Sequence, residues 1–338
     1  MKTNLFLVAI ATMFFTTAAY AQQVFNVQNG TKTEFYDDLE TAIQKAVSGD
    51  TIYLPGRVIQ VQDDLIIDKK LAIIGAGCDV DSIGGLQTTE IKRNTGYARI
   101  TFRNGSDGSL LMGCIVGNIQ FGHRDEFNVY QQNIQNVIIC RNKITGYILL
   151  GLSTTNNQVK QIVVSENSIQ GVNGIQGYEA SDCIINNNLS SIMGLKNSRI
   201  YNNVMQNTAN LTECIVENNF IAGGISGSNS IFNNNAFMTN ITFPSGSNSG
   251  SNNLMSQETI RTFVVNDLAL PKNLKIRDDS PCKNAGTDGT DIGIFGGPAP
   301  YKDGAVPFNP HIGKANISAQ TDKDGKLKVD IKVSAQTK

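Results

Sequence analysis

The feature that most constrains the fold is one short segment that recurs six times between Val137 and Phe237. Each copy is a run of apolar and small residues that ends around an asparagine. The aligned asparagines are Asn142, Asn167, Asn188, Asn203, Asn219 and Asn235, so the steps are 25, 21, 15, 16 and 16 residues. Self-similarity at this period is typical of a solenoid, whose units bury their apolar faces only by stacking on their neighbours.

Within the repeat, an apolar column lies three residues before each asparagine. Its members are Ile139, Val164, Ile185, Ile200, Val216 and Phe232. Small or apolar residues lie two positions earlier, and mostly polar residues separate the column from the asparagine. This period of two predicts a short β-strand with one buried face. The asparagine is predicted to form the turn, because Asn tolerates positive φ, and stacked amides could bond to one another in a ladder.

Two other kinds of solenoid fit the repeat less well. A helical repeat requires a period of 3.6 residues, which these short β-branched runs lack. A left-handed β-helix requires a strict six-residue apolar rhythm, and steps of 15 to 25 residues do not keep one. The repeat therefore favours parallel β-strands stacked coil upon coil.

Segments on both sides of the repeat resemble a known family. The matching segments are DLETAI (38–43), SGDTIYLPG (48–56), LAIIGAG (71–77), SPC (280–282) and DIGIFGG (291–297). They resemble the first helix, the first two strands and the closing segment of the pectate-lyase-like superfamily, in its secreted bacterial form. This resemblance covers roughly residues 35–297 and implies an all-β fold, the right-handed parallel β-helix. It implies little about activity, since the fold hosts lyases, hydrolases, adhesins and inert scaffolds.

The first residues predict export. Residues 1–21 resemble a secretory signal peptide, with Lys2 at the start, an apolar run from Leu5 to Phe15 and a small-x-small site at Ala19–Ala21. The apolar run is too short for a membrane span, and no later segment is apolar enough to be one. The expected location is therefore secreted, periplasmic or at the cell surface.

Residues 22–297 are predicted to form the β-helix, and a helix at 36–49 is predicted to cover its open end. The apolar stripe of this helix is Leu39, Ala42, Ile43, Ala46 and Val47. Residues 298–313 predict a linker, and residues 314–338 predict a β-hairpin tail. We expect the tail to cover either one end of the β-helix or an outward aliphatic column. That column contains Ile138, Val163, Ile184, Ile215 and Ile231, and Arg199 interrupts it.

Composition excludes some partners and one kind of cross-link. The chain has 28 basic and 29 acidic residues and no basic patch, so nucleic acid is not an expected partner. Among its six cysteines, Cys183 and Cys214 share a column two coils apart. That spacing is about 9.6 Å, beyond the ~7 Å reach of a disulfide between Cα atoms. We expect buried thiols.

Charged and aromatic residues near the repeat are the candidate functional residues. The candidate catalytic residues are His123, Arg124, Arg141 and Lys143, and the candidate ligand-binding residues are Asp125, Glu126, Glu166, Tyr147 and Tyr178. Lyases of the superfamily need a cation, or Ca²⁺ held by acidic side chains, to neutralise a uronate carboxylate. A Lys, Arg or His then takes the adjacent proton. The alternative interpretation of these charges is a solvated loop with an ion pair.

The sequence favours an exported β-helix protein that is not catalytic and that interacts with glycan or acts as a cell-surface or structural module. It lacks the paired-aspartate and Gly-His-Gly motifs of polygalacturonases and the aspartate-rich calcium motifs of pectate lyases. The alternative is a polysaccharide lyase that cleaves a uronate-containing polysaccharide by β-elimination. Whether the chain is an enzyme stays open. No cofactor is expected, apart from Ca²⁺ if the chain is a lyase.

Overall fold

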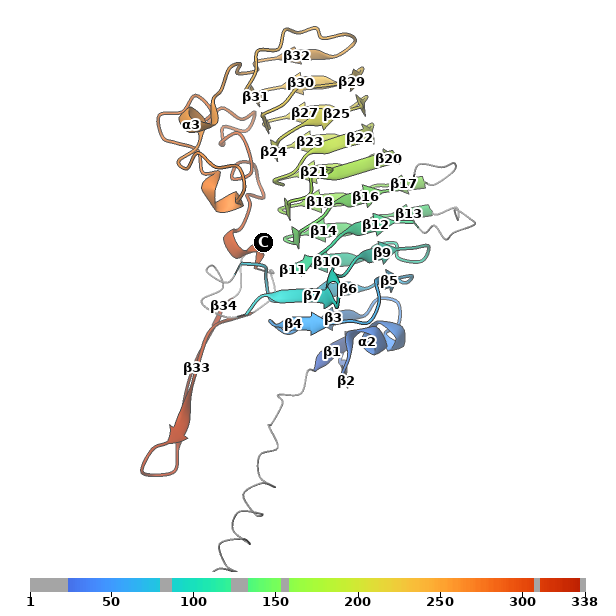
Figure 1. Ribbon diagram of the computed structural model, residues 1–338, viewed down its shortest axis with the longest axis vertical. Helices are drawn as coiled ribbons and strands as arrows, with labels where there is room; N and C mark the ends of the chain where they lie inside the picture. The colour runs from blue at the N-terminus through green and yellow to red at the C-terminus, as the bar shows by residue number, and fades with distance from the viewer. Residues whose placement is uncertain (1–23, 80–86, 123–132, 153–157, 307–310, 335–338) are drawn as a thin grey trace, which may run out of the picture.

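The computed structural model describes residues 24–79, 87–122, 133–152, 158–306 and 311–334. Short parallel strands stack along the long axis of the molecule and form three sheets, named A, B and C here (Figure 1). The chain is therefore an all-β parallel solenoid, as the repeat predicts. The predicted signal peptide, residues 1–21, lies outside the described residues.

Sheet A contains the predicted repeat strands and runs the length of the rod. Its strands are β2 (Lys32–Tyr36), β1 (Phe25–Asn29), β3 (Thr51–Tyr53), β6 (Ala72–Ile74), β10 (Leu110–Met112), β14 (Ile138–Cys140), β18 (Val163–Ser165), β21 (Ile184–Asn186), β23 (Arg199–Tyr201), β27 (Ile215–Glu217), β30 (Ile231–Asn233) and β32 (Ser249–Ser251). All pairings are parallel except those of β1 with β2 and β3.

Sheets B and C form the other two faces. Sheet B consists of β4 (Val58–Gln60), β7 (Thr89–Arg93), β8 (Gly96–Tyr97), β11 (Cys114–Val116), β15 (Lys143–Ile144), β19 (Ser168–Ile169), β24 (Val204–Met205), β28 (Phe220–Ile221) and β31 (Ala236–Phe237). Sheet C consists of β5 (Leu65–Ile67), β9 (Ile100–Phe102), β12 (Ile119–Phe121), β13 (Asn133–Gln135), β16 (Ile148–Leu150), β17 (Gln158–Lys160), β20 (Ile175–Ser181), β22 (Ile192–Lys196), β25 (Thr208–Ala209), β26 (Leu211–Thr212) and β29 (Gly227–Ser228).

The predicted apolar column is the core of sheet A. Each member pairs in register with the next, from Leu111 through Ile139 to Phe232. Every one of these side chains is completely buried. Coils of different length can share this core because extra residues enter at the corners, outside the short strands.

The repeat asparagines form the predicted ladder inside the rod. The backbone N–H of Asn167 donates to Oδ1 of Asn188 at 2.9 Å. Nδ2 of Asn188 donates to the carbonyl of Val164 in the preceding coil at 2.8 Å and to that of Asn186 at 2.9 Å. The same pattern extends to Asn253, and at the other end the N–H of Cys114 donates to Asn142. The ladder satisfies backbone groups at a buried corner, where each unpaired group would be costly.

The turn at this corner is made one residue earlier than predicted. The residues before the ladder have φ between 52° and 57°, and we call them the left-handed column: Arg141, Glu166, Asn187, Asn202, Asn218, Asn234 and Asn252. The ladder amide must point into the coil to reach backbone groups, so its neighbour makes the bend. Asn is common in this column because it tolerates the left-handed region.

Helix α2 (Leu39–Lys45) covers the N-terminal end of the core, but it is shorter than the predicted 36–49. The Asp38 side chain accepts a hydrogen bond from the N–H of Thr41 at 2.7 Å and caps the helix start. At the other end, Nζ of Lys69 donates to the carbonyls of Ile43, Gln44 and Ala46. The apolar stripe is buried except for Val47, which lies beyond the last turn and is exposed.

After the last coil, residues 259–306 run back along sheet B; we call them the return segment (Figure 1). The segment contains α3 (Thr259–Thr262), η1 (Pro271–Asn273) and η2 (Asp303–Ala305). Its apolar side chains pack on Leu189, Val204 and Phe220. Segment 280–297 therefore covers a side of the rod. The predicted linker 298–313 also begins as packed chain, because Ala305 and Val306 are buried.

The predicted hairpin is present as β33 (His311–Thr321) and β34 (Leu327–Ser334), which pair antiparallel. It extends away from the coil stack (Figure 1). The expectation that it covers an end of the rod or the aliphatic column is therefore wrong for the single chain. Both the apolar side chains of β34 and most of that column are exposed.

All six cysteines are buried free thiols. The prediction from spacing, made for Cys183 and Cys214, is confirmed. None of the helices within the described residues has the length and hydropathy needed to cross a bilayer.

Replacing a ladder asparagine should destabilise the rod. Asn188→Ala leaves buried N–H and carbonyl groups of two coils without their side-chain partner, so the free energy of unfolding should fall by about 2–4 kcal/mol. Asn240→Ala is the control, because Asn240 is exposed and outside the ladder. Urea unfolding followed by circular dichroism measures both, and equal midpoints would contradict a stabilising ladder.

Candidate functional site

The outer column of sheet B distinguishes one stretch of the rod from the rest. Its residues pair in register in the order Glu90, Ile115, Lys143, Ser168, Leu189, Val204, Phe220 and Ala236. From Leu189 onward they are apolar, and the return segment buries them. Glu90, Lys143 and Ser168 are polar, so the first coils of this column present polar groups between sheet B and the return segment.

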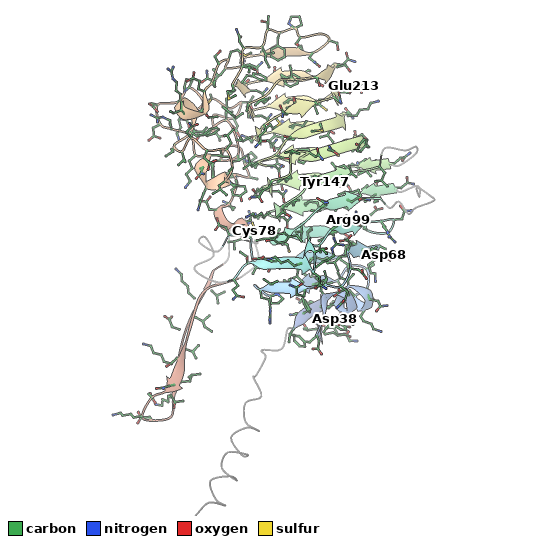
Figure 2. The ribbon with its side chains drawn as sticks, in the orientation of Figure 1. Asp38, Asp68, Cys78, Arg99, Tyr147 and Glu213 are labelled. Carbon is green, nitrogen blue, oxygen red and sulfur yellow. The ribbon has the colours of Figure 1, made fainter. Side chains whose placement is uncertain are left out.

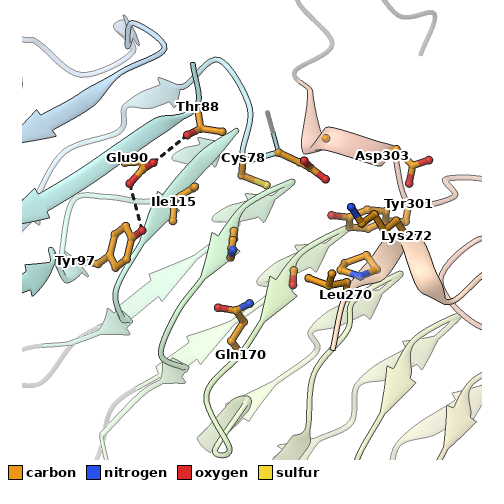
Figure 3. A pocket seen from close by; sticks show the side chains of 15 residues that line it. Cys78, Thr88, Glu90, Tyr97, Ile115, Gln170, Leu270, Lys272, Tyr301 and Asp303 are labelled. Carbon is orange, nitrogen blue, oxygen red and sulfur yellow. Dashed lines mark hydrogen bonds between the residues drawn. The ribbon is translucent and has the colours of Figure 1, made fainter. Parts of the chain in front are cut away.

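These polar residues line a cavity of about 360 Å³, which we call the wall cavity. Cys78, Glu90, Tyr97 and Lys143 lie on the coil side. Tyr301 and Asp303 of the return segment lie across from them, next to Lys272 and Leu270 (Figure 3). The cavity therefore exists only because the return segment folds back along the rod.

Glu90 is the most heavily bonded carboxylate of the cavity. Nζ of Lys92 lies 2.6 Å from it, and the hydroxyls of Thr88 and Tyr97 donate to it at 3.1 and 3.2 Å. Burial alone would raise the pKa of Glu90, but the hydrogen bonds from Lys92 and Thr88 outweigh burial and lower it. Burial and the Glu90 charge raise the pKa of Tyr97. At neutral pH Glu90 is therefore ionised and Tyr97 is a neutral donor.

Lys143 is different, because within the described residues its ammonium group has no ion pair or hydrogen bond. It lies near Cys78. Burial raises the pKa of the Cys78 thiol to about 12, so this thiol is neutral. On the opposite wall, Asp303 already pairs with Lys275 at 3.6 Å. Lys143 is thus a half-buried cation available to an anionic ligand in the cavity.

Arg141 and Glu166 are brought together, but beneath the surface. Nε of Arg141 lies 3.0 Å from the Glu166 carboxylate, and their side chains are 2% and 5% exposed. Nη1 of Arg141 also donates to the carbonyl of Val306 at 2.7 Å. Farther along the left-handed column, Asn187 donates to Ile294 and Gly296 in the same way. The column therefore fastens the return segment to the rod, and Arg141 and Glu166 belong to that fastening.

The two predicted tyrosines lie on another face. Tyr178 is in β20 of sheet C, and Tyr147 precedes β16 of the same sheet. The register aligns Ile148 with Ile175, so Tyr147 is level with the residue before β20 and Tyr178 lies four residues farther along that strand. Figure 2 shows Tyr147 over the strands and Cys78 at the edge of the rod beside the return segment. The tyrosines therefore form no common platform with the wall cavity.

The remaining predicted residues are His123, Arg124, Asp125 and Glu126, and they lie outside the described residues. Within the described part, no group of three or more His, Cys, Asp or Glu side chains could hold a metal ion. Three carboxylates line the wall cavity, Asp79, Glu90 and Asp303, and two of them already pair with lysines, Glu90 with Lys92 and Asp303 with Lys275.

Sequence reasoning found Lys143 but missed Glu90, Tyr97 and the return segment. One signal was available in the residue that follows each ladder asparagine. It is polar in the first two repeats, Lys143 and Ser168, and apolar in the next three, Leu189, Val204 and Phe220. That change marks where the apolar contact between sheet B and the return segment gives way to the polar wall cavity. No pattern in the repeat indicates that a segment more than 100 residues later supplies the opposite wall.

No protein-family model matches this chain, and no curated protein matches it in sequence.

Breaking the buried ion pair should loosen the return segment. Glu166→Asn leaves the Arg141 guanidinium buried without its carboxylate and should lower the free energy of unfolding by about 3–5 kcal/mol. The double variant Arg141→Asn/Glu166→Asn places asparagine, the usual residue of the left-handed column, at both positions. Its free energy of unfolding should fall less than that of Glu166→Asn alone. Glu217→Asn, which breaks the exposed pair with Arg199, is the control and should cost less than about 1 kcal/mol. A double variant less stable than Glu166→Asn, measured by urea unfolding, would contradict this role.

Glu166 should also give stability a pH dependence. Burial raises the pKa of Glu166 above its usual 4.5 and outweighs the Arg141 charge, which lowers it. The folded state then holds the proton more tightly than the unfolded chain. The stability contributed by Glu166 is full below pH 4.5 and declines as the pH rises through the raised folded pKa. The difference in unfolding free energy between wild type and Glu166→Gln should therefore fall from pH 4 to pH 8; a difference that grows would show that the Arg141 charge dominates.

Proposed function

We propose that this chain is an exported β-helix protein that binds an acidic glycan in the wall cavity and does not cleave it. The observation that carries this proposal is Lys143, a half-buried cation in a cavity that also offers the polar side chains of Ser168 and Gln170. A ligand carboxylate would supply the charge partner that Lys143 lacks among the described residues. Sugar hydroxyls can bond to the neighbouring polar groups.

The described cavity supports binding better than catalysis. β-Elimination needs a base close to the proton that is removed. Tyr97 is a poor base at neutral pH, because its pKa is raised and its hydroxyl already donates to Glu90. No His or Arg lies among the described residues that line the cavity, which leaves Lys143 and Lys272 as the candidate bases, and the proposal assigns Lys143 to pairing with the ligand carboxylate.

The proposed biology follows from the sequence. Residues 1–21 would direct export, and the rod would serve at the cell surface or in the periplasm as a glycan-binding or structural module. The sequence motifs and the stacked parallel sheets support a distant relation to the pectate-lyase-like superfamily. The stacked sheets are common to many parallel solenoids, so this relation rests mainly on the sequence motifs.

Removing the Lys143 charge should weaken acidic glycan binding. Lys143→Gln should reduce the affinity for a soluble polyuronate by about tenfold, the value of one charge-assisted contact, and the wild-type affinity should fall with added salt. Affinity electrophoresis through polyuronate gels, followed by titration calorimetry with oligomers, measures the change. Lys160→Gln is the matched control, because Lys160 is another half-buried lysine but lies in β17 of sheet C.

Equal loss in both variants would show nonspecific attraction and remove the wall cavity as the site. The lyase alternative is tested in the same samples by absorbance at 235 nm, with and without Ca²⁺. We expect no unsaturated product. Turnover that is abolished by His123→Ala or Lys143→Ala would replace the proposal with the lyase.

A further inference from the structure

The C-terminal hairpin presents an apolar face that the chain itself does not cover. Leu327, Val329, Ile331 and Val333 alternate along β34, so they share one face, which we call the hairpin strip. Each of these side chains is 49–59% exposed. An isolated two-stranded hairpin is marginally stable in water. The hairpin strip therefore requires a partner surface.

Sheet A carries a second uncovered apolar row. Ile138, Ile184, Ile215 and Ile231 point outward from β14, β21, β27 and β30 and are 39–43% exposed. Val163 lies between the first two in register and is half-buried. We call this row the sheet A ridge. Arg199 of β23 lies in register between Ile184 and Ile215 and interrupts this row, and its guanidinium pairs with Glu217. The aliphatic side chains on either side of Arg199 form two flat patches on a regular parallel sheet, on which a β-ribbon can lie.

We propose that the hairpin strip of one chain packs on the sheet A ridge of a second copy, and that the exchange is reciprocal. The two surfaces match in length. Four alternating residues of a strand span about 20 Å, and six coils from Ile138 to Ile231 span about 24 Å. Each chain has one hairpin strip and one sheet A ridge, so a dimer leaves neither surface uncovered.

The exchanged contact also reaches the size of a stable interface. A half-exposed Leu, Ile or Val presents roughly 80 Å² of surface. One strip on one ridge then buries about 600 Å² of side-chain surface, and the reciprocal pair buries about 1,200 Å², at the lower end of the range for specific stable interfaces. Two hairpin strips packed on each other would bury only about half as much.

The direction of the hairpin favours a second copy over its own ridge. Val306, the last described residue before the hairpin, is fixed to the coil of Arg141. From that level the hairpin extends past the N-terminal end of the rod, whereas the sheet A ridge runs toward the C-terminal end (Figure 1). The two-fold exchange closes the assembly, so the apolar surfaces do not propagate into a filament.

The test combines oligomeric state with contact mapping on the full chain. Light scattering after size exclusion should give a dimer for the wild type. Val329→Lys/Ile331→Lys in the strip and Ile184→Lys/Ile215→Lys in the ridge should each weaken the dimer by at least about tenfold. Lys328→Ala/Lys332→Ala changes the opposite face of β34 and should leave the dimer intact. Circular dichroism verifies that each variant is folded.

Cysteine pairs then identify the contact, since the native thiols are all buried. A chain with Val329→Cys mixed with a chain with Ile184→Cys should form a disulfide-linked species of twice the monomer mass under mild oxidation, and neither chain alone should do so. A wild-type monomer at high concentration would overturn the proposal. Disulfide linkage of two Val329→Cys chains to each other would also overturn it and would show that hairpins pack on hairpins. Linkage within a single chain that carries both substitutions would show that the hairpin packs on its own ridge.

Discussion

The structure depends on the asparagine amides at one buried corner of the rod. Each amide donates to carbonyls of its own coil and of the coil before it, and it accepts from the coil before it. The Asn188 side chain also donates to Oδ1 of Asn203 in the next coil, so it ties three coils together. The interaction requires only that a strand of sheet A and this corner keep their geometry. Loops elsewhere in a coil can then lengthen, which explains steps that vary from 25 to 15 residues over an unbroken apolar column.

The residue before each amide gives the same corner a second role. Its left-handed conformation turns its side chain outward, where Asn187, Asn202 and Asn218 bond to the return segment. Arg141 and Glu166 replace asparagine at two coils beside the end of the segment, where their ion pair and the hydrogen bond from Arg141 to the carbonyl of Val306 hold the chain. The wall cavity lies beside this point, so the corner that builds the rod also positions one wall of the candidate site.

The sequence predicted the parts of the molecule that repeat. Period-two alternation and aligned asparagines were enough for the strands of sheet A, the buried column of Ile139 and its partners, and the ladder. The turn was placed one residue late, because Asn occupies both the ladder and most of the left-handed column. Arg141 and Glu166 were predicted as functional residues, but both are buried, and nothing local to them reveals that the end of the return segment bonds to them. Contacts that join segments separated by more than 100 residues leave no periodic signal.

The central claim is that stacked amides hold the coils in register, and hydrogen exchange of the backbone amides tests it directly. The N–H groups of Asn142, Asn167, Asn188, Asn203 and Asn219 donate to ladder oxygens. They should exchange as slowly as the central strands of sheet A and far more slowly than other turn residues such as Asn240. Exchange of these groups at the rate of exposed turns, while the strands remain protected, would contradict the account.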